Sequence, residues 1–215
     1  MVTIESMALS QTALSQLEVV CDHVSSAGPT VTHVRGTVLV SSLLTLKAAG
    51  HYDRYVELLP REWHEPVLFA LASSWLPIEL GLVHYQTCEA LALDNHELTQ
   101  IGELLATRYA DTFLGTILQK TRDAGVNAPW IALRAQPRIW ERMYMGGGVK
   151  IYRTGPKDAL GEFSGLPLAR FRYFRVAFAG YYQGLANMFV RSAYVTAARP
   201  MNPGGDTFAI TGSWV

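Results

Sequence analysis

The sequence has no excess of charge of either sign. Its 18 basic side chains are balanced by 18 acidic ones, and only 17% of its 215 residues are charged. Nucleic acids and anionic membranes attract proteins that carry an excess of basic side chains. The balance therefore argues against a nucleic-acid-binding role. The hydrophobic share of 49% argues against a disordered chain and predicts a globular protein.

Cysteine is scarce, and only Cys21 and Cys88 are present. The two lie far apart, each in a stretch whose apolar residues have helical spacing, so we expect two buried thiols rather than a disulfide. The sequence has no CxxC pair and no cysteine/histidine spacing typical of zinc ligands. We therefore predict no structural metal site.

Long hydrophobic runs are also lacking. The longest apolar stretch, residues 67–83, is interrupted by two serines, a proline and a glutamate, whereas a membrane-spanning helix needs about 20 predominantly apolar residues. Residues 1–16 do not have the basic segment and following apolar run of a secretory signal. We expect a cytoplasmic protein without a membrane span, and a disordered lead-in over residues 1–13.

No catalytic signature stands out. No two of the six histidines share a helix at i, i+3 or i+4 spacing, and there is no Gly-x-Ser-x-Gly nucleophile elbow. The glycine triplet at 146–148 follows a predicted helix and precedes a strand, the reverse of a phosphate-binding loop, so we interpret it as a hinge or helix stop. A weak enzymatic hypothesis uses His64 as a base oriented by Glu62 or Glu65. The simpler interpretation of His64 is a surface imidazole.

The first two thirds of the chain are predicted to be helical. Apolar residues recur at helical spacing, and glycine or proline ends most of the segments. Asp94 or Asn95 caps the longest predicted helix, and Pro137 divides the last one into two pieces. The predicted helices cover residues 14–24, 38–49, 53–59, 67–76, 78–93, 97–123 and 129–142.

The rest of the chain predicts two strands, a helix and two more strands. The strands lie at 149–153, 159–163, 194–198 and 207–213, and the helix at 171–190. We predict an α+β fold in which a helical part, residues 14–145, packs on a C-terminal antiparallel sheet part of ββαββ order, residues 146–215. One domain over 14–215 is expected, because an end piece of ~70 residues buries little surface by itself.

A cluster of aromatic and basic residues at the junction of the two parts supplies the candidate ligand-binding site. Aromatic rings and arginines together can grip a planar or anionic ligand. We predict an apolar pocket between the long helix and this junction, with Arg142 or Arg172 orienting a polar group. In the alternative interpretation, the arginine stems cover a sheet edge and the aromatic rings form core. The candidates are Trp140, Arg142, Tyr144, Arg172, Tyr173, Tyr109 and Phe113.

Several segments are similar to an uncharacterised paralogous family known mainly from myxobacteria. The likeness spans most of the chain. It rests on the run PRIWERMY at 137–144, the glycine hinge, the Thr-Gly-Pro turn at 154–156 and a terminal strand ending in Trp214. It also includes Val-Arg-Gly at 34–36 and the segment 55–60.

The order of helices followed by ββαββ also resembles a wider ligand-binding superfamily, which includes haem/nitric-oxide sensors, vinyl-reductase-type sensor domains and transport-particle subunits. This resemblance implies a regulatory ligand or partner pocket between helices and sheet, and does not imply catalysis. The haem sensors ligate iron through a histidine before the first strand, but residues 128–145 contain none. Their Tyr-x-Ser-x-Arg clamp is missing from residues 159–168. We therefore expect no haem.

These observations favour a non-enzymatic ligand-binding or sensory domain for a small apolar or amphipathic molecule. The alternative is a protein–protein interaction or scaffold subunit in the form of a homodimer. Its interface would use the glycines of 171–190 and the apolar residues of 67–83.

Overall fold

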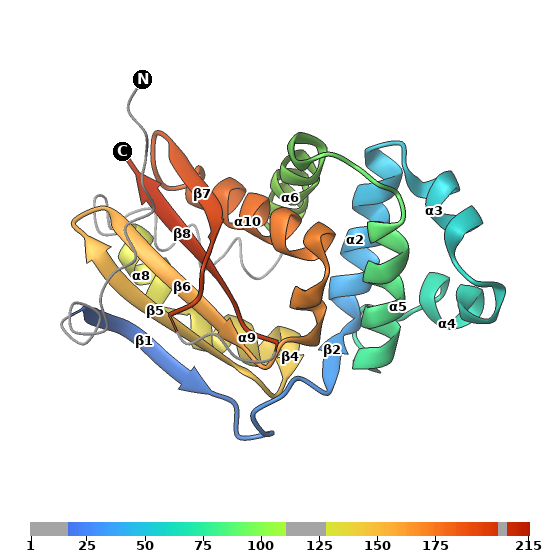
Figure 1. The fold of residues 1–215 in the computed structure, drawn as a ribbon, viewed down its shortest axis with the longest axis horizontal. Helices are drawn as coiled ribbons and strands as arrows, with labels where there is room; N and C mark the ends of the chain where they lie inside the picture. The colour runs from blue at the N-terminus through green and yellow to red at the C-terminus, as the bar shows by residue number, and fades with distance from the viewer. Residues whose placement is uncertain (1–16, 111–127, 202–205) are drawn as a thin grey trace.

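The computed structural model describes residues 17–110, 128–201 and 206–215, with only the backbone described at residues 109 and 110. The fold is α+β, as predicted. A five-stranded antiparallel sheet lies on one side of the molecule and a layer of helices on the other (Figure 1). The expected lead-in, residues 1–13, lies outside these ranges. Within them, no helix is both long enough and apolar enough to cross a bilayer.

The C-terminal part supplies most of the sheet. Its strands and its helix follow one another in the predicted order: β5 (Gly148–Gly155), β6 (Asp158–Ser164), α10 (Arg172–Ala186), β7 (Ala193–Ala198) and β8 (Phe208–Trp214). A short 3-10 turn, η3 (Pro167–Arg170), leads into α10. Every pairing in this sheet is antiparallel. Alternate side chains such as Ile151 and Phe163 are buried on the face that the helices cover.

One strand of this sheet comes from the opposite end of the chain. β1 (Glu18–Val24) pairs with β5, so the strand order is β1-β5-β6-β8-β7. The predicted helix over residues 14–24 is therefore wrong where the structure describes it. Its apolar residues fit a helical or a strand period over so short a run. Its three β-branched valines favour the strand once β5 offers backbone hydrogen-bonding partners.

The helical layer contains α2 (Gly36–Ala48), α3 (Tyr52–Leu58), η1 (Arg61–Trp63), α4 (His64–Leu68) and α5 (Ile78–Glu89). Of these, α2, α3 and α5 correspond to predicted helices. The predicted helix over residues 67–76 is wrong, because α4 ends at Leu68. The carbonyls of Ala72 and Ser74 instead accept hydrogen bonds from backbone amides at the start of α2, which holds this segment as a turn.

A second, three-stranded sheet lies where the two layers meet. It has the order β3-β2-β4 and consists of β3 (Trp75–Pro77), β2 (His33–Arg35) and β4 (Tyr144–Met145). The glycine hinge follows β4, and both Gly146 and Gly147 have positive φ angles. A Cβ atom on Gly146 would lie 2.0 Å from the Thr30 carbonyl oxygen. Glycine is therefore required where the chain turns from β4 into β5.

Three further helices come between α5 and β4 in the sequence: α6 (Asn95–Ala110), α8 (Ala128–Arg134) and α9 (Gln136–Met143). The predicted cap of α6 is present as a reciprocal capping box. The Asp94 amide donates to Glu97 Oε2 and the Glu97 amide donates to Asp94 Oδ1, both at 2.9 Å. The rest of the predicted helix, residues 111–123, lies outside the described residues. The division of the last helix near Pro137 is confirmed.

The glycines of α10 serve packing inside this chain. A Cβ atom on Gly180 would lie 2.4 Å from the Thr99 carbonyl oxygen, and one on Gly184 would lie 2.7 Å from Cβ of Ala106. From the other side, a Cβ atom on Gly102 would lie 2.1 Å from the Ala177 carbonyl oxygen. These glycines therefore let α6 and α10 approach closely within one chain.

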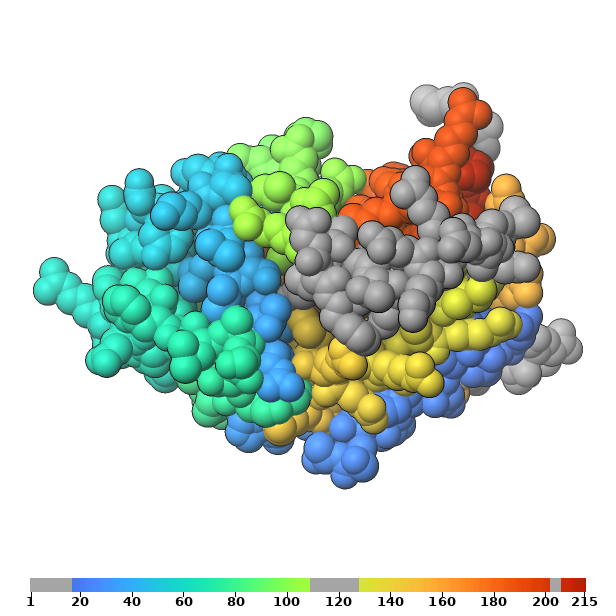
Figure 2. Space-filling model, turned by 180° about the vertical axis from the view of Figure 1, so that it is seen from behind, coloured from blue at the N-terminus to red at the C-terminus, as the bar shows by residue number. Residues whose placement is uncertain are grey.

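One hydrophobic core runs through both layers. Its buried members include Leu39 and Tyr55 from the helical layer and Ile151 and Phe163 from the sheet. Seen from behind, α8 and α9 (yellow) lie alongside β1 (blue), although more than 100 residues separate them in the chain (Figure 2). The middle helices therefore close the sheet face that β1 helps to form.

Candidate functional site

Two adjoining pockets lie within the core. The first has a volume of about 100 Å³ and lies between the inner face of the five-stranded sheet and helices α8, α9 and α10. We call it the sheet pocket. Its lining from the described residues is almost entirely apolar, and it includes Leu133, Ile151, Phe163, Leu185, Ile210 and Trp214.

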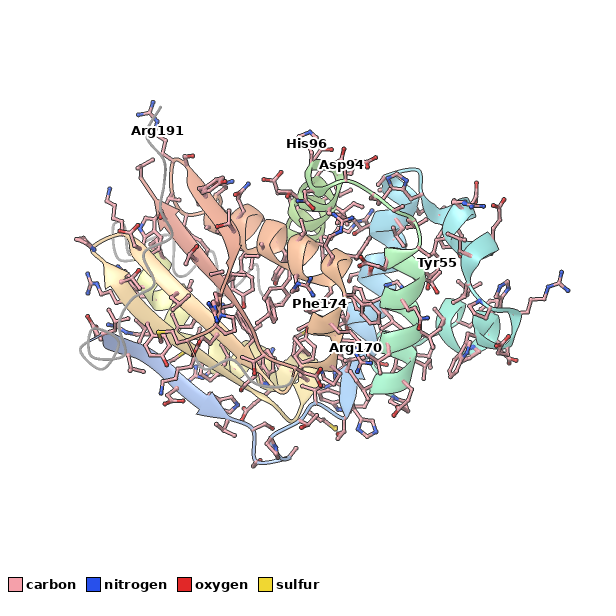
Figure 3. All side chains as sticks on the ribbon, in the orientation of Figure 1. Tyr55, Asp94, His96, Arg170, Phe174 and Arg191 are labelled. Atoms are coloured by element: carbon pink, nitrogen blue, oxygen red, sulfur yellow. The ribbon has the colours of Figure 1, made fainter. Side chains whose placement is uncertain are left out.

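The second pocket lies between α2, α6, α9 and α10 and has a volume of about 80 Å³. We call it the helix pocket. Its wall combines apolar side chains with hydroxyl groups, and Phe174 of α10 lies in the middle of the molecule beside it (Figure 3). Its lining includes Ser42, Thr45, Ile101, Trp140, Tyr144 and Tyr173.

The structure brings together three of the predicted site residues. Trp140, Tyr144 and Tyr173 all line the helix pocket and are at least nine-tenths buried. The Trp140 and Tyr144 rings are in contact, with centroids 4.6 Å apart. The Trp140 indole N–H donates to the Gly146 carbonyl at 3.0 Å, which joins the aromatic wall to the glycine hinge.

The two predicted arginines do not line either pocket. Arg142 is exposed on α9, and its carbonyl accepts a hydrogen bond from Arg35. Arg172 points toward the start of α6, where its guanidinium donates to the Leu93 carbonyl and to Asn95 Oδ1. Its Nε also lies 3.8 Å from Glu89 Oε1. Arg172 is therefore used in joining α10 to the α5–α6 connection, and the prediction that it faces the pocket is wrong.

The two candidates on the long helix cannot be placed in the pocket wall. Phe113 lies outside the described residues, and the side chain of Tyr109 is not among those described. The side of α6 that does reach the helix pocket contributes Ile101 and Leu105.

A buried hydrogen-bonded chain lies behind the helix pocket. The Tyr55 hydroxyl is 2.7 Å from His84 Nδ1, and His84 Nε2 is 2.9 Å from the Ser42 hydroxyl. Tyr55 comes from α3 beside α5 (Figure 3), His84 from α5 and Ser42 from α2. A neutral imidazole has one donor and one acceptor nitrogen, so these two contacts satisfy it.

Burial keeps the side chains of this hydrogen-bonded chain uncharged. It lowers the pKa of His84 to about 3 and raises the pKa of Tyr55. Both groups are therefore neutral near pH 7. Ser42, His84 and Tyr55 have the spacing of a nucleophile, base and orienting group, but a general base needs a pKa close to the working pH. His84 is too weak a base for that role, and we assign no catalysis to it.

Two more polar groups border this hydrogen-bonded chain. The Cys88 thiol lies 3.6 Å from His84 Nε2. The Tyr173 hydroxyl is buried and, within the described part of the chain, has no hydrogen bond of ordinary geometry. Its neighbour Cys88 is a weak partner. Burial raises the pKa of both groups well above the usual values, so the whole cluster is uncharged.

One hydrogen bond stands between the two pockets. The Tyr182 hydroxyl donates to Gln136 Oε1 at 2.8 Å. Both residues line the sheet pocket and the helix pocket, as does Ile139. The pair therefore forms part of the wall that divides the two volumes.

His64 does not have the partners that the enzymatic hypothesis gave it. Its Nε2 lies 2.9 Å from the Leu59 carbonyl oxygen. A carbonyl only accepts, so this nitrogen is the donor and is not available to take up a proton. Over the described ranges, no group of three histidine, cysteine, aspartate or glutamate side chains is arranged to hold a metal ion.

Sequence reasoning missed the polar chain behind the helix pocket and the Tyr182–Gln136 pair. Ser42, Tyr55 and His84 come from three helices, so no local spacing relates them. The only local signal was the presence of His84 and Cys88 one helical turn apart. Comparison with protein-family models gives no match, and comparison with curated proteins gives none either.

Proposed function

We propose that this protein is a non-catalytic binding domain for a small apolar or amphipathic molecule, which is held in the sheet pocket and the helix pocket. The observation that carries the proposal is the pairing of two core pockets whose described lining has no charged side chain. Small-molecule sites are concave and mostly apolar, with a few polar groups that fix orientation. The hydroxyls of the helix pocket supply such groups.

We also propose a sensory or regulatory role, which the position of α10 supports. This helix lines both pockets, packs on α6 and contacts β7 and β8. A ligand that binds one arrangement of α10 more tightly than another would shift the population of the whole helix–sheet interface. We propose that the occupied and empty forms differ in this packing, and that a partner reads the difference.

The test is ligand-induced stabilisation of the full chain, with benzene and short alcohols as probes. A ligand at 100 times its Kd stabilises the folded state by about 2.7 kcal/mol. The double variant Ala159→Leu/Ala177→Leu, which adds side-chain volume in both pockets, should lose this stabilisation. Ala197→Leu, at an exposed strand position outside both pockets, should keep it. A wild-type protein that no probe stabilises would rule the proposal out.

The homodimer alternative stays a prediction, and fewer of its proposed interface residues are free to contact a second copy. Its proposed glycines pack against α6 within the same chain. Of the segment 67–83, Phe69 and Leu71 remain highly exposed, at 77% and 67%. Sedimentation of wild type and a Phe69→Ser/Leu71→Ser variant over a range of concentrations tests whether they promote self-association.

A further inference from the structure

We infer that the occupant is one neutral amphiphile that spans both pockets, with an uncharged hydroxyl head beside Ser42 and a hydrocarbon tail in the sheet pocket. The inference rests on the proposed function and adds the ligand class and its direction. Three features carry it: the size of the pockets, the chemistry of their linings, and the wall between them.

Size argues for a ligand that uses both pockets. The sheet pocket and the helix pocket measure about 100 Å³ and about 80 Å³. An engineered apolar cavity of roughly 150 Å³ is known to hold one benzene molecule. Each pocket alone is smaller than that cavity, whereas the two together are larger. A molecule larger than benzene therefore needs both volumes.

The two linings determine which end of the ligand lies in which pocket. Hydroxyl-bearing side chains gather in the helix pocket, while the sheet pocket is lined mainly by aliphatic and aromatic carbon. Ser42 uses one of its hydrogen-bonding positions on His84 Nε2 and keeps others, because a hydroxyl has one donor and two acceptor positions. The Thr45 hydroxyl donates to the Ser41 carbonyl and can still accept. The polar end therefore belongs in the helix pocket.

The head group is uncharged. The described lining of both pockets contains no lysine, arginine, aspartate or glutamate, and His84 is neutral. A buried ion without a partner is strongly disfavoured. An alcohol fits because it both donates and accepts, so it can match Ser42 whichever way the Ser42–His84 hydrogen bond runs.

The Tyr182–Gln136 hydrogen bond is the partition that such a ligand must pass. Its two side chains come from α10 and α9 and line both pockets. Breaking this bond leaves a hydroxyl and an amide oxygen without partners beside an apolar tail, which costs more than the bond's net contribution to folding. Burial of several methylene groups must offset that cost. A tail of sufficient length can therefore open this partition and enter the sheet pocket.

The experiment is a titration of the full chain with primary alcohols from 1-butanol to 1-octanol, followed by calorimetry and by methyl NMR. Each added methylene should tighten binding roughly fourfold, the equivalent of 0.8 kcal/mol, as far as 1-octanol. Methyl shifts should begin at Ile101 in the helix pocket and extend to Ile210 in the sheet pocket as the chain lengthens. Octanoate and octylammonium should bind at least tenfold more weakly than 1-octanol. Ser42→Ala should weaken 1-octanol but not benzene.

Tyr182→Phe and Gln136→Leu remove the partition hydrogen bond from opposite sides. Either variant should favour the long alcohols over 1-butanol, relative to wild type. An affinity that stops rising at 1-butanol in the wild type and both variants would overturn the spanning model while leaving small-ligand binding intact. Equal binding of octanoate would overturn the neutral head. Failure of every probe, benzene included, would instead remove the proposed function itself.

Discussion

The Tyr55 hydroxyl lies 2.7 Å from Nδ1 of His84, and neither side chain has any exposed surface. This contact joins α3 to α5 at the centre of the helical layer. Since Ser42 takes the other ring nitrogen, the imidazole cross-links three helices while staying uncharged. The stability of this layer should therefore depend on a polar chain as well as on apolar packing.

Removing the Tyr55 hydroxyl tests that dependence. Tyr55→Phe leaves His84 Nδ1 buried without its partner, so we expect the free energy of unfolding to fall by about 1–3 kcal/mol. Urea denaturation followed by circular dichroism measures the change. Tyr52→Phe, at a half-buried position on the same helix, is the matched control and should change stability by less than about 0.5 kcal/mol. Equal effects of the two substitutions would contradict the role given to Tyr55.

The pKa of His84 predicts how stability changes with pH. Burial lowers it to about 3 in the folded protein, whereas an unfolded histidine titrates near 6.5. The unfolded state therefore binds the extra proton first as the pH falls. This contribution to stability is complete above about pH 6.5 and is lost progressively from there toward pH 3. Between pH 7 and pH 5 the loss should be about 2 kcal/mol.

His84→Leu provides the comparison for this pH dependence. The variant has no titrating ring at this position, so its unfolding free energy should fall by about 2 kcal/mol less than that of the wild type over the same interval. Urea midpoints at pH 7, 6 and 5 give both curves. Parallel curves would show that His84 does not stay neutral in the folded state.

The contact of α6 with α10 predicts a strong effect at Gly180. A Cβ atom there would lie 2.4 Å from the Thr99 carbonyl oxygen, so Gly180→Ala must push the two backbones apart. We expect a loss of about 1–3 kcal/mol despite the better helix propensity of alanine. Gly212→Ala is the control, because the added Cβ atom would lie an ordinary 3.5 Å from Cγ2 of Val195. It should cost less than about 1 kcal/mol in thermal unfolding.

Arg172 should matter for stability and not for ligand binding. Arg172→Ala removes its hydrogen bonds to Leu93 and Asn95. The side chain is partly exposed, so we expect a loss of about 1–2 kcal/mol. Arg54→Ala breaks an exposed pair with Glu57 and should cost less than about 0.5 kcal/mol. If Arg172→Ala weakened the binding of benzene or 1-octanol, Arg172 would have a place in the pocket after all.

The local sequence pattern was enough to predict the helices and strands that have strong periodicity or clear end signals. The Asp94–Glu97 capping box, the interruption near Pro137 and the strand–helix alternation after the glycine hinge could all be predicted. The segment 18–24 could not, because its conformation depends on β5, whose paired residues lie more than 120 positions away. The segment 67–76 failed for a similar reason, since its turn depends on amides at Gly36 and Thr37.

The same distinction between local signals and long-range contacts applies to the candidate site. Trp140, Tyr144 and Tyr173 were identified because they belong to two runs that mix aromatic and basic side chains, one before the hinge and one at the start of the late helix. Arg172 belongs to the same sequence cluster, but its direction depends on the α5–α6 connection. Tyr182 and Gln136 looked ordinary within their own helices, and their importance depends on the distance between their side chains.

The pairing of β1 with β5 has a consequence for synthesis of the protein on the ribosome. β1 is made early, but the residue opposite Glu18 is Arg153. At about 5–20 residues per second, the valine-rich strand must wait on the order of 10 s before its partner has been made. During that interval the helices α2 to α6 can form from neighbouring parts of the chain, whereas β1 has no partner strand and exposes its valines to water. Nascent chains that stop between the two strands should therefore be the ones that most need a chaperone.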